Sequence, residues 1–308
     1  MENHPEPLKI DDELGYDKNI LLDRVKYEDY AKAPGMNASG LKELIRSPEH
    51  YYEYRYNHVE PKDTDSKLKG RLTHFAVLEP EMFMDTHVVE PVFEGYTQKG
   101  ELTTNPNCKE VKEAKAKWYA ELKPDAIVVP SEMLTALTGM TTKILKHPRA
   151  KNLLRDGVRE TTLFWDDPET GELCKARPDF VTSKGHLVDL KTANDASPIA
   201  FERAIVNFKY WLQAAHYCAG AKATNTAKHD KFIFLVIETS HPYGISLHEL
   251  VEEDMYEPQR RRANLMQRYA HCKRTNTWPG YDVNINRISI PPWYDKDIQH
   301  FQEDENAN

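Results

Sequence analysis

Residues 174–192 read Cys-Lys-Ala-Arg-Pro-Asp-Phe-Val-Thr-Ser-Lys-Gly-His-Leu-Val-Asp-Leu-Lys-Thr, and the rest of the chain is organised around this stretch. Apolar residues on either side of the turn signal Ser183-Lys184-Gly185 predict two short strands joined by a tight turn. A hairpin that pivots on Lys184 places Asp179 opposite Asp189. Directly opposed antiparallel residues share a face of the sheet, with Cβ atoms about 4.5–5.5 Å apart.

The same register brings a basic pair beside the two aspartates. It predicts that Arg177 lies opposite Lys191. Since alternate residues of a strand share a face, Asp189 and Lys191 lie together on the side opposite Leu190. The hairpin therefore brings two carboxylates and an ammonium group onto one patch.

Two neighbouring carboxylates repel each other, and a divalent cation removes that penalty. Mg²⁺ takes hard oxygen ligands and is commonly held by one or two carboxylates together with a substrate phosphate. A lysine beside such an ion can orient or deprotonate a water and offset charge on a phosphate. The alternative is an edge hairpin with solvated charges, because Asp-x-Lys is a short pattern that arises often by chance.

Further motifs favour the metal site. Pro178-Asp179, followed by Asp189-Leu190-Lys191, resembles the pattern after which the PD-(D/E)XK nuclease superfamily is named. The wider stretch that opens with Glu160-Thr-Thr-Leu-Phe-Trp and ends with Gln213-Ala-Ala-His-Tyr217 resembles the phage-derived RecE type, the C-terminal nuclease domain of exodeoxyribonuclease VIII. The resemblance runs from about Asn37 to Trp293 and is strongest over 160–217.

This resemblance implies an α/β fold. The expected core is restriction-endonuclease-like, with a mixed central sheet flanked by helices and an added N-terminal helical region. Residues 36–157 would form the helical region that bears His74, and residues 158–296 the catalytic core. The expected divisions of the chain are a polar arm at 1–35, a single nuclease domain at 36–296 and an acidic tail at 297–308.

Composition sets broad limits on the function. The 308 residues are 40% hydrophobic and 29% charged, with a net charge of −8 from 41 basic and 49 acidic residues. This balance argues against a general nucleic-acid coat protein, although a local basic channel can exist in an acidic protein. The absence of a long apolar run or a signal segment predicts a cytoplasmic protein without membrane spans. None of the four cysteines forms a C-x-x-C pair, so we expect reduced structural thiols.

A helix predicted over Ser66–Leu78 carries a basic stripe. Lys67, Gly70, Arg71 and His74 recur at helical spacing, which suits either a phosphate-facing surface or an ordinary solvated face. The stretch from Gly70 to His74, with Leu78-Glu-Pro80, resembles the histidine motif of RecE- and RecB-type nucleases. The resemblance implies that His74 helps to hold a metal ion, and we expect Arg71 to bind DNA.

Several further elements are predicted from pattern alone. Ser39 is expected to cap a helix through Arg46, and Ser47-Pro48 to begin a second helix, whose four tyrosines either pack a helix pair or wall a DNA groove. Strands at 161–165 and 174–181 and the strand through Asp189 are expected to form a meander. The apolar run Lys231–Glu238 predicts a central strand. A final helix over Asp254–Lys273 carries four arginines, either as a solvated face or as a DNA or subunit contact.

Other site residues rest on the resemblance. It implies that Glu160 lies near the metal, although a glutamate at a strand end is more often solvated. Gln213 and Tyr217 lie one turn apart on a predicted helix from Phe208 to Ala221. Their spacing matches the family's Gln-x-x-x-Tyr motif, which lies over the cleft and contacts nucleic acid. The alternative for these two residues is an ordinary amphipathic helix.

The expected cofactor is Mg²⁺, with Mn²⁺ able to substitute. Asp179 and Asp189 would bind the ion, and the Leu190 carbonyl would be available as a further ligand. His74 and Glu160 could complete a second metal position. Two-metal sites of this kind hold their ions about 3.5–4 Å apart and clamp the attacking and leaving oxygens.

The leading functional hypothesis is a metal-dependent exonuclease acting on double-stranded DNA ends. Lys191 would position the attacking water, and Arg177 would contact the DNA. By resemblance the enzyme would degrade the 5′ strand and leave a 3′ overhang for a RecT-type annealing protein in phage recombination or repair. By the same analogy it would form a ring-like homo-oligomer, a trimer or tetramer. The alternatives are an endonuclease of the same superfamily and an inactive protein that binds DNA ends or regulates another.

Overall fold

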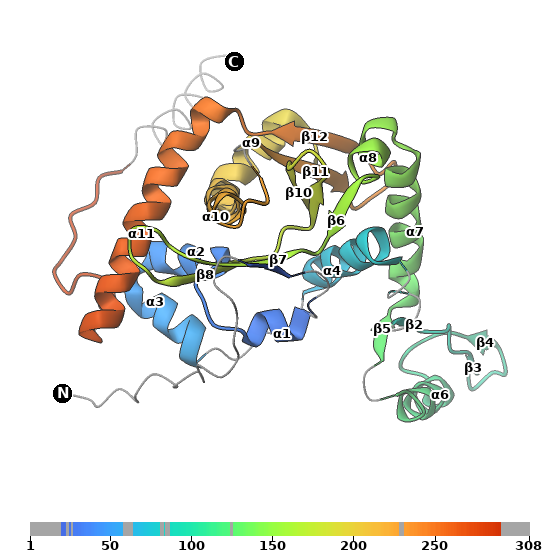
Figure 1. Cartoon of the computed structure of the whole chain (residues 1–308). Helices are drawn as coiled ribbons and strands as arrows, with labels where there is room; N and C mark the ends of the chain where they lie inside the picture. Colours follow the sequence, from blue (N-terminus) through green and yellow to red (C-terminus); the bar gives the residue numbers. More distant parts are fainter. Residues whose placement is uncertain are drawn as a thin grey trace, which may run out of the picture.

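Helices cover both faces of a mixed β-sheet (Figure 1). The computed structural model describes residues 20–22, 25, 27–57, 64–80, 83, 87–123, 126–227 and 231–290. The predicted acidic tail and most of the predicted N-terminal arm therefore lie outside the described residues. The predicted α/β fold with a mixed central sheet is confirmed. None of the described helices has the length and apolar character that a membrane span requires.

The central sheet has five strands. Its order is β12 (Ile245–Glu249), β11 (Phe232–Glu238), β10 (Leu187–Ala193), β9 (Phe180–Thr182) and β6 (Gly157–Arg159). β10 and β11 run parallel, and the other pairs are antiparallel. β11 is buried from Phe232 to Ile237, which confirms the predicted central strand. The middle of this sheet is therefore the strand that carries Asp189 and Lys191.

The predicted hairpin register is confirmed, but its first strand is shorter than predicted. Val181 pairs with Leu187 and Phe180 with Val188, as a pivot on Lys184 requires. The strand does not extend back to Cys174. A proline lacks the N–H group that a continuous ladder needs, and Pro178 follows the point where the preceding strand ends.

That preceding strand belongs to a separate sheet. β8 (Leu173–Ala176) pairs with β7 (Thr162–Asp166), which also pairs with β1 (Ile20–Leu22). The predicted meander is therefore wrong, because the chain passes from one sheet to the other at residues 177–179. The predicted pairing of Arg177 with Lys191 is wrong for the same reason: Arg177 lies outside both strands.

Strand alternation divides the buried side chains between two cores. Along β11, Phe232, Phe234 and Val236 face the first core, and the residues between them face the second. Along β10, Leu187 faces the first core and Leu190 the second. Asp189 follows Leu187 by two positions in the strand. Because alternate residues of a strand share a face, its side chain is directed to the same face as Leu187.

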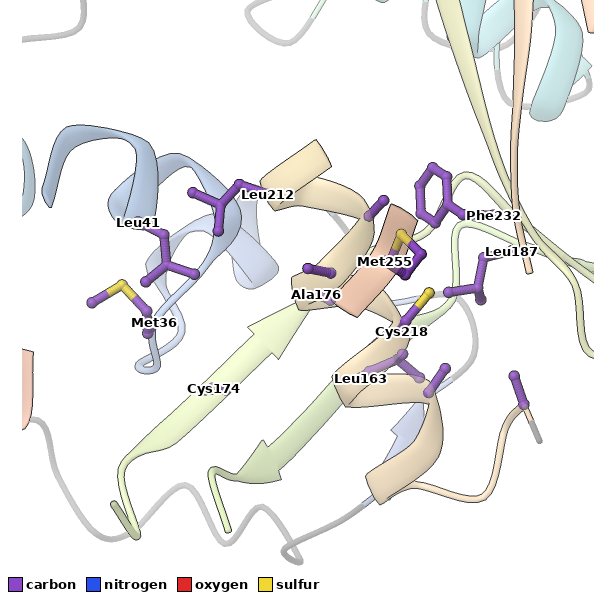
Figure 2. Close-up of a cluster of buried hydrophobic side chains, with 14 of the residues drawn as sticks. Met36, Leu41, Leu163, Cys174, Ala176, Leu187, Leu212, Cys218, Phe232 and Met255 are labelled. Carbon is purple, nitrogen blue, oxygen red and sulfur yellow. The ribbon is translucent and has the colours of Figure 1, made fainter. Parts of the chain in front are cut away.

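The first core lies between the sheets and the helices of both chain ends. In Figure 2, Leu41, Leu163, Leu212 and Cys218 point into it. All four cysteines are free thiols, as predicted. The helices around this core are α2 (Ala38–Arg46), α3 (Pro48–Tyr52), α9 (Pro198–Asn207), α10 (Tyr210–Ala223) and α11 (Tyr256–Thr275), with the π turn η1 (Glu53–Asn57) after α3 and the 3-10 turn η2 (Glu252–Met255) before α11.

The second core lies on the other face of the central sheet. It is covered by α4 (Asp65–Leu78), α7 (Ser131–Lys146) and α8 (Pro148–Leu153). A small outlying part, at the lower right of Figure 1, contains β2 (His87–Val89), β3 (Gly95–Tyr96), β4 (Leu102–Thr103), α6 (Lys109–Ala120) and β5 (Ile127–Val129). Residues 36–157 therefore contribute to both cores and include short strands as well as helices.

Helix caps follow the predicted chemistry, with one correction. The Ser47 hydroxyl accepts from the backbone N–H of His50 at the start of α3, and Ser197 caps α9 in the same way. The cap of α2 is Asn37 and not Ser39, because the Asn37 side chain accepts from the backbone N–H of Gly40 at 2.7 Å. The predicted helix is therefore correct, and its start lies at Ala38.

A buried ionic network joins α11 to α10. Arg262 is 6% exposed and donates to Asp167 at 2.7 Å and to His216 Nδ1 at 3.3 Å. His216 Nε2 lies 3.1 Å from the carbonyls of Met36 and Lys175. Burial, with the Arg262 guanidinium beside it, lowers the pKa of His216 to about 3. Arg262 is therefore internal, contrary to the solvated face predicted for the arginine run, and His216 is a neutral structural residue.

The N-terminal segment is held by a buried lysine. After β1 comes the short helix α1 (Tyr27–Lys32), and the Lys175 ammonium donates to the carbonyls of Tyr30 at 2.7 Å and Ala33 at 2.6 Å. Burial, followed by the nearby Arg55, lowers the pKa of Lys175 to about 7. The described part of the region predicted as a loose arm is therefore packed against β7 and β8.

Close packing of α10 on β7 gives a first testable prediction. A Cβ atom added at Gly220 would lie 2.5 Å from the buried Trp165 ring. We expect Gly220→Ala to destabilise the fold by about 1–3 kcal/mol in urea unfolding, although alanine favours helices. Gly70→Ala in α4 is the matched control, since its Cβ would meet only the Thr192 hydroxyl at 3.2 Å. Equal stabilities for the two variants would contradict this packing.

Candidate active site

Three side chains that can bind a metal converge beside the central sheet. His74 from α4, Glu160 from the β6–β7 connection and Asp179 from the start of β9 place one ligand atom each within 4.8 Å of the others. His74 Nδ1 lies 3.4 Å from Asp179 Oδ2. One imidazole nitrogen and two carboxylate oxygens form a donor set that suits a divalent ion.

Backbone contacts fix the two carboxylates. The backbone N–H of Leu190 donates to Asp179 Oδ2 at 2.6 Å. The backbone N–H of Glu160 donates to the Asp179 carbonyl at 2.9 Å. Glu160 has a φ of 49°, in the left-handed region that costs a residue with a Cβ free energy. Such strain persists only where the surroundings hold it, so the direction of the Glu160 side chain is set by tertiary contacts.

The second predicted carboxylate lies next to this cluster and is almost completely buried. Asp189 is 1% exposed, and its Oδ2 lies 2.5 Å from the Lys191 ammonium. Its Oδ1 accepts from the Gln213 side-chain amide at 2.6 Å. Both oxygens of Asp189 therefore have protein partners, and Lys191 serves as its counter-ion. The role of the Leu190 carbonyl as a ligand stays a prediction.

Burial and the neighbouring charges shift the pKa values of the clustered groups. Burial, with Asp179 beside it, raises the pKa of Glu160 to about 7. Burial also raises the pKa of Asp189, although Lys191 opposes this shift. Burial alone would lower the pKa of His74, but the Asp179 carboxylate outweighs it and raises that pKa to about 9. A divalent cation would relieve these buried charges, so the residues fit a metal ion.

Lys191 has a second partner that the sequence analysis missed. Its ammonium lies 4.8 Å from the centroid of the Tyr210 ring, a cation–π contact. Tyr210 precedes Gln213 by one turn of α10, so a single turn of this helix contacts both Asp189 and Lys191. The only sequence signal for Tyr210 is this spacing of three residues from Gln213.

A cleft of about 950 Å³ opens onto His74, Glu160 and Asp179. Its lining is mainly basic and aromatic, which supports a local basic surface in a chain of net negative charge. The basic residues are Lys32, Arg55, Lys67, Arg71, Lys175 and Arg177, and the aromatic residues are Tyr30, Tyr51, Tyr54, Phe75 and Tyr217. The predicted site residues Arg71 and Tyr217 thus lie in the wall of this cleft.

The tyrosines of the predicted second helix include some that pack in the core and some that line the cleft. Tyr51 and Tyr52 are buried, and both rings pack against Trp278. Tyr51 and Tyr54 also line the cleft. Packing therefore accounts for Tyr52, whereas Tyr54 is placed where it could contact a ligand.

Two predicted DNA contacts have protein partners instead. The Arg177 guanidinium donates to Glu160 at 2.6 Å and to the Val25 carbonyl at 2.6 Å. Gln213 is 8% exposed, and its side-chain amide donates to Asp189. The predicted contacts of Arg177 and Gln213 with DNA stay predictions. In this arrangement both side chains orient carboxylates of the site.

These features define the class. Asp179 immediately before β9, Asp189 and Lys191 within β10, and the adjacent His74 and Glu160 match the residue pattern of the PD-(D/E)XK nuclease superfamily. The chain belongs to the family described as "PDDEXK-like domain of unknown function (DUF3799)", which it matches over residues 37–288. This family match covers the sheet, both cores and every residue of the site.

Solved structures support the fold. A crystal structure from Eubacterium rectale, titled "Putative exonuclease", is similar with a TM-score of 0.55 and 14% identity, over 87% of this chain and 96% of that one. The structure of SSO0001 has 16% identity over 76% of this chain and 86% of that one, with a TM-score of 0.27. No curated protein matches the sequence.

The raised pKa of Glu160 predicts how stability depends on pH. A carboxyl group whose folded pKa is raised to about 7 stabilises the fold fully below its unfolded pKa, and this contribution is lost as the pH rises through 7. With a chelator present, we compare the free energy of unfolding of Glu160→Gln with that of the wild type. We expect this difference to shift in favour of the variant by up to about 3 kcal/mol as the pH rises from 4 to 8. Urea unfolding at both pH values measures this gain. The control is Glu202→Gln on the exposed face of α9, and a gain independent of pH would contradict the assignment.

The contact between Gln213 and Asp189 predicts a metal-binding defect. Partners that orient a ligand typically contribute about 10–100-fold to metal affinity or activity. We expect Gln213→Ala to weaken Mg²⁺ or Mn²⁺ binding by this order in calorimetric titration. Gln267→Ala on the exposed side of α11 is the matched control. Unchanged metal affinity combined with weaker DNA binding would restore the direct DNA contact first expected for Gln213.

Proposed function

We propose that this protein is a Mg²⁺-dependent exonuclease that hydrolyses phosphodiester bonds at double-stranded DNA ends. The observation that carries the proposal is the convergence of His74, Glu160 and Asp179 at a basic, aromatic cleft, beside the Asp189–Lys191 pair. Metal ligands alone would fit many hydrolases. Cations that track phosphates and aromatic rings that stack on bases are typical of channels for a single nucleic-acid strand.

The chain's own residues divide the chemistry. A divalent ion held by Asp179, Glu160 and His74 would neutralise phosphate oxygens and lower the pKa of a bound water. Asp189 is the further carboxylate available to the ion, and Gln213 fixes its orientation. Lys191 is held between Asp189 and the Tyr210 ring, where its ammonium can orient the attacking water and offset charge on the phosphate.

The preference for ends rests on the shape of the site and on the resemblance. The cleft is bounded by α1, α2, η1 and α4, and its basic and aromatic lining suits one strand of an opened end. The resemblance to the RecE type supplies the remaining parts of the proposal. These are the 5′-to-3′ polarity, the 3′ overhang, the annealing partner, the role in recombination or repair, and the homo-oligomer. Mn²⁺ is expected to replace Mg²⁺.

One assay tests this function directly. Linear duplexes labelled separately at the 5′ and 3′ ends are incubated with Mg²⁺, beside a covalently closed circle. We expect release of nucleotides from the 5′ strand and an intact circle. Cleavage of the circle would show an endonuclease instead, and binding of ends without any cleavage would show an inactive end-binding protein.

Lys191 provides the variant that ties the activity to this site. We expect Lys191→Ala to lose about 10²–10³-fold in turnover, the usual effect of one well-placed donor. Lys191→Arg should not restore the rate fully, because a planar guanidinium does not replace a compact ammonium. Lys184→Ala, in the exposed turn of the same hairpin, is the matched control. Near-normal turnover in Lys191→Ala would remove the Asp-Leu-Lys strand from the mechanism.

A further inference from the structure

The Tyr210 ring lies close to two ammonium groups. Lys191 Nζ is 4.8 Å from the ring centroid, and Lys42 Nζ, from α2, is 5.3 Å from it. The two lysines are 149 positions apart in the sequence and meet because α2 packs against α10. Lys42 is therefore a neighbour of the catalytic lysine, although no motif connects the two.

The two ammonium groups differ in their counter-ions. Lys191 is paired with Asp189 at 2.5 Å. Among the residues that the structure describes, no carboxylate lies within ion-pair distance of Lys42, which is half-buried. Burial, followed by repulsion from Lys191, lowers the pKa of Lys42 to about 8, so the group still carries its charge at neutral pH. A half-buried cation without an anionic partner is costly unless a ligand supplies the anion.

The position of Lys42 indicates the kind of anionic ligand that would pair with it. Asn37, Ala38 and Ser39 of the same helix region line the cleft, and Lys42 follows one turn after Ser39. Asp189 is the carboxylate whose charge acts most on Lys42, and Lys191 and Lys209 oppose it with positive charge. Lys42 therefore lies beside Lys191, the cation proposed to act at the phosphate that is cleaved.

We propose that Lys42 binds a phosphate of the nucleic-acid strand next to the phosphate at the metal cluster, and so sets the register of the strand in the site. The inference rests on the proposed function, because it takes the ligand to be a nucleic-acid strand. Lys42 binds substrate in this assignment, whereas Tyr210 is a positioning residue that holds both ammonium groups. The Tyr210 ring attracts both ammonium groups through cation–π contacts and neutralises neither charge.

The test separates the charge of Lys42 from its packing. Lys42→Met keeps an unbranched apolar stem over Tyr210 and removes the ammonium. Lys151→Met on α8 removes the same charge from an exposed lysine and is the matched control. Binding of a labelled duplex with a short single-stranded end is measured by anisotropy over a salt series, with Ca²⁺ in place of Mg²⁺. Urea unfolding of each variant checks that its fold is retained.

We expect Lys42→Met to weaken binding and to reduce the slope of log K against log salt by about 1, the signature of one lost phosphate contact. Lys42→Arg should retain the slope, and Lys151→Met should match the wild type. In Mg²⁺, any loss of rate should appear mainly as a raised KM, unlike the loss of turnover expected for Lys191→Ala.

Each outcome decides between the two proposals. An unchanged slope in Lys42→Met would overturn the phosphate assignment even if the wild type cleaves DNA. A reduced slope in a protein that binds but never cleaves would support Lys42 and overturn the nuclease proposal. A wild type that binds no DNA under any salt condition would overturn both.

Discussion

The burial of Asp179 and Asp189 beside each other is the constraint on which the rest of the structure depends. Two carboxylates removed from water on adjacent strands repel each other, and each needs donors or cations close by. Asp179 receives the Leu190 N–H and the His74 imidazole, and Asp189 receives Lys191 and the Gln213 amide. These partners come from different elements, so the fold has to bring α4, β10 and α10 to one point.

The position of β10 between two cores makes this arrangement rigid. Leu187 is anchored on one side of the sheet and Leu190 on the other, while the residues between and after them carry the acid and the base. A slip of one residue would turn Asp189 and Lys191 into the opposite core and expose Leu190 to the site. The same apolar packing that stabilises the sheet therefore fixes the register of the charged groups.

The walls of the cleft depend on contacts that are themselves polar. Lys175 and Arg177 hold carbonyls of the N-terminal segment, and Arg177 also orients Glu160. Lys175 and Arg177 thus donate to backbone carbonyls of the protein itself. Lys42, by contrast, lacks a carboxylate partner among the described residues. This division explains how a chain with a net charge of −8 presents a basic surface beside a group of acids.

Local structure could be predicted from the sequence alone: the turn at Lys184, the register that opposes Asp179 and Asp189, the helix start at Ser47, and the buried strand Phe232–Glu238. These features depend on residues a few positions apart, so alternation and turn chemistry are enough to predict them. The motif resemblance added the likeness to a nuclease family and the candidate site residues.

Only the tertiary structure decided which groups touch. It placed Gln213 on Asp189, Arg177 on Glu160, and Lys42 with Lys191 on Tyr210. The contacts of Gln213, Lys42 and Lys191 join different elements of the fold. The contact between Arg177 and Glu160 forms where the chain passes from one sheet to the other. Helix α10 is buried along most of its length, so its pattern of apolar and polar residues does not reveal which side meets the sheet. Long-range packing settles that choice, because α10 has to cover the first core and bring Gln213 to the buried Asp189 carboxylate.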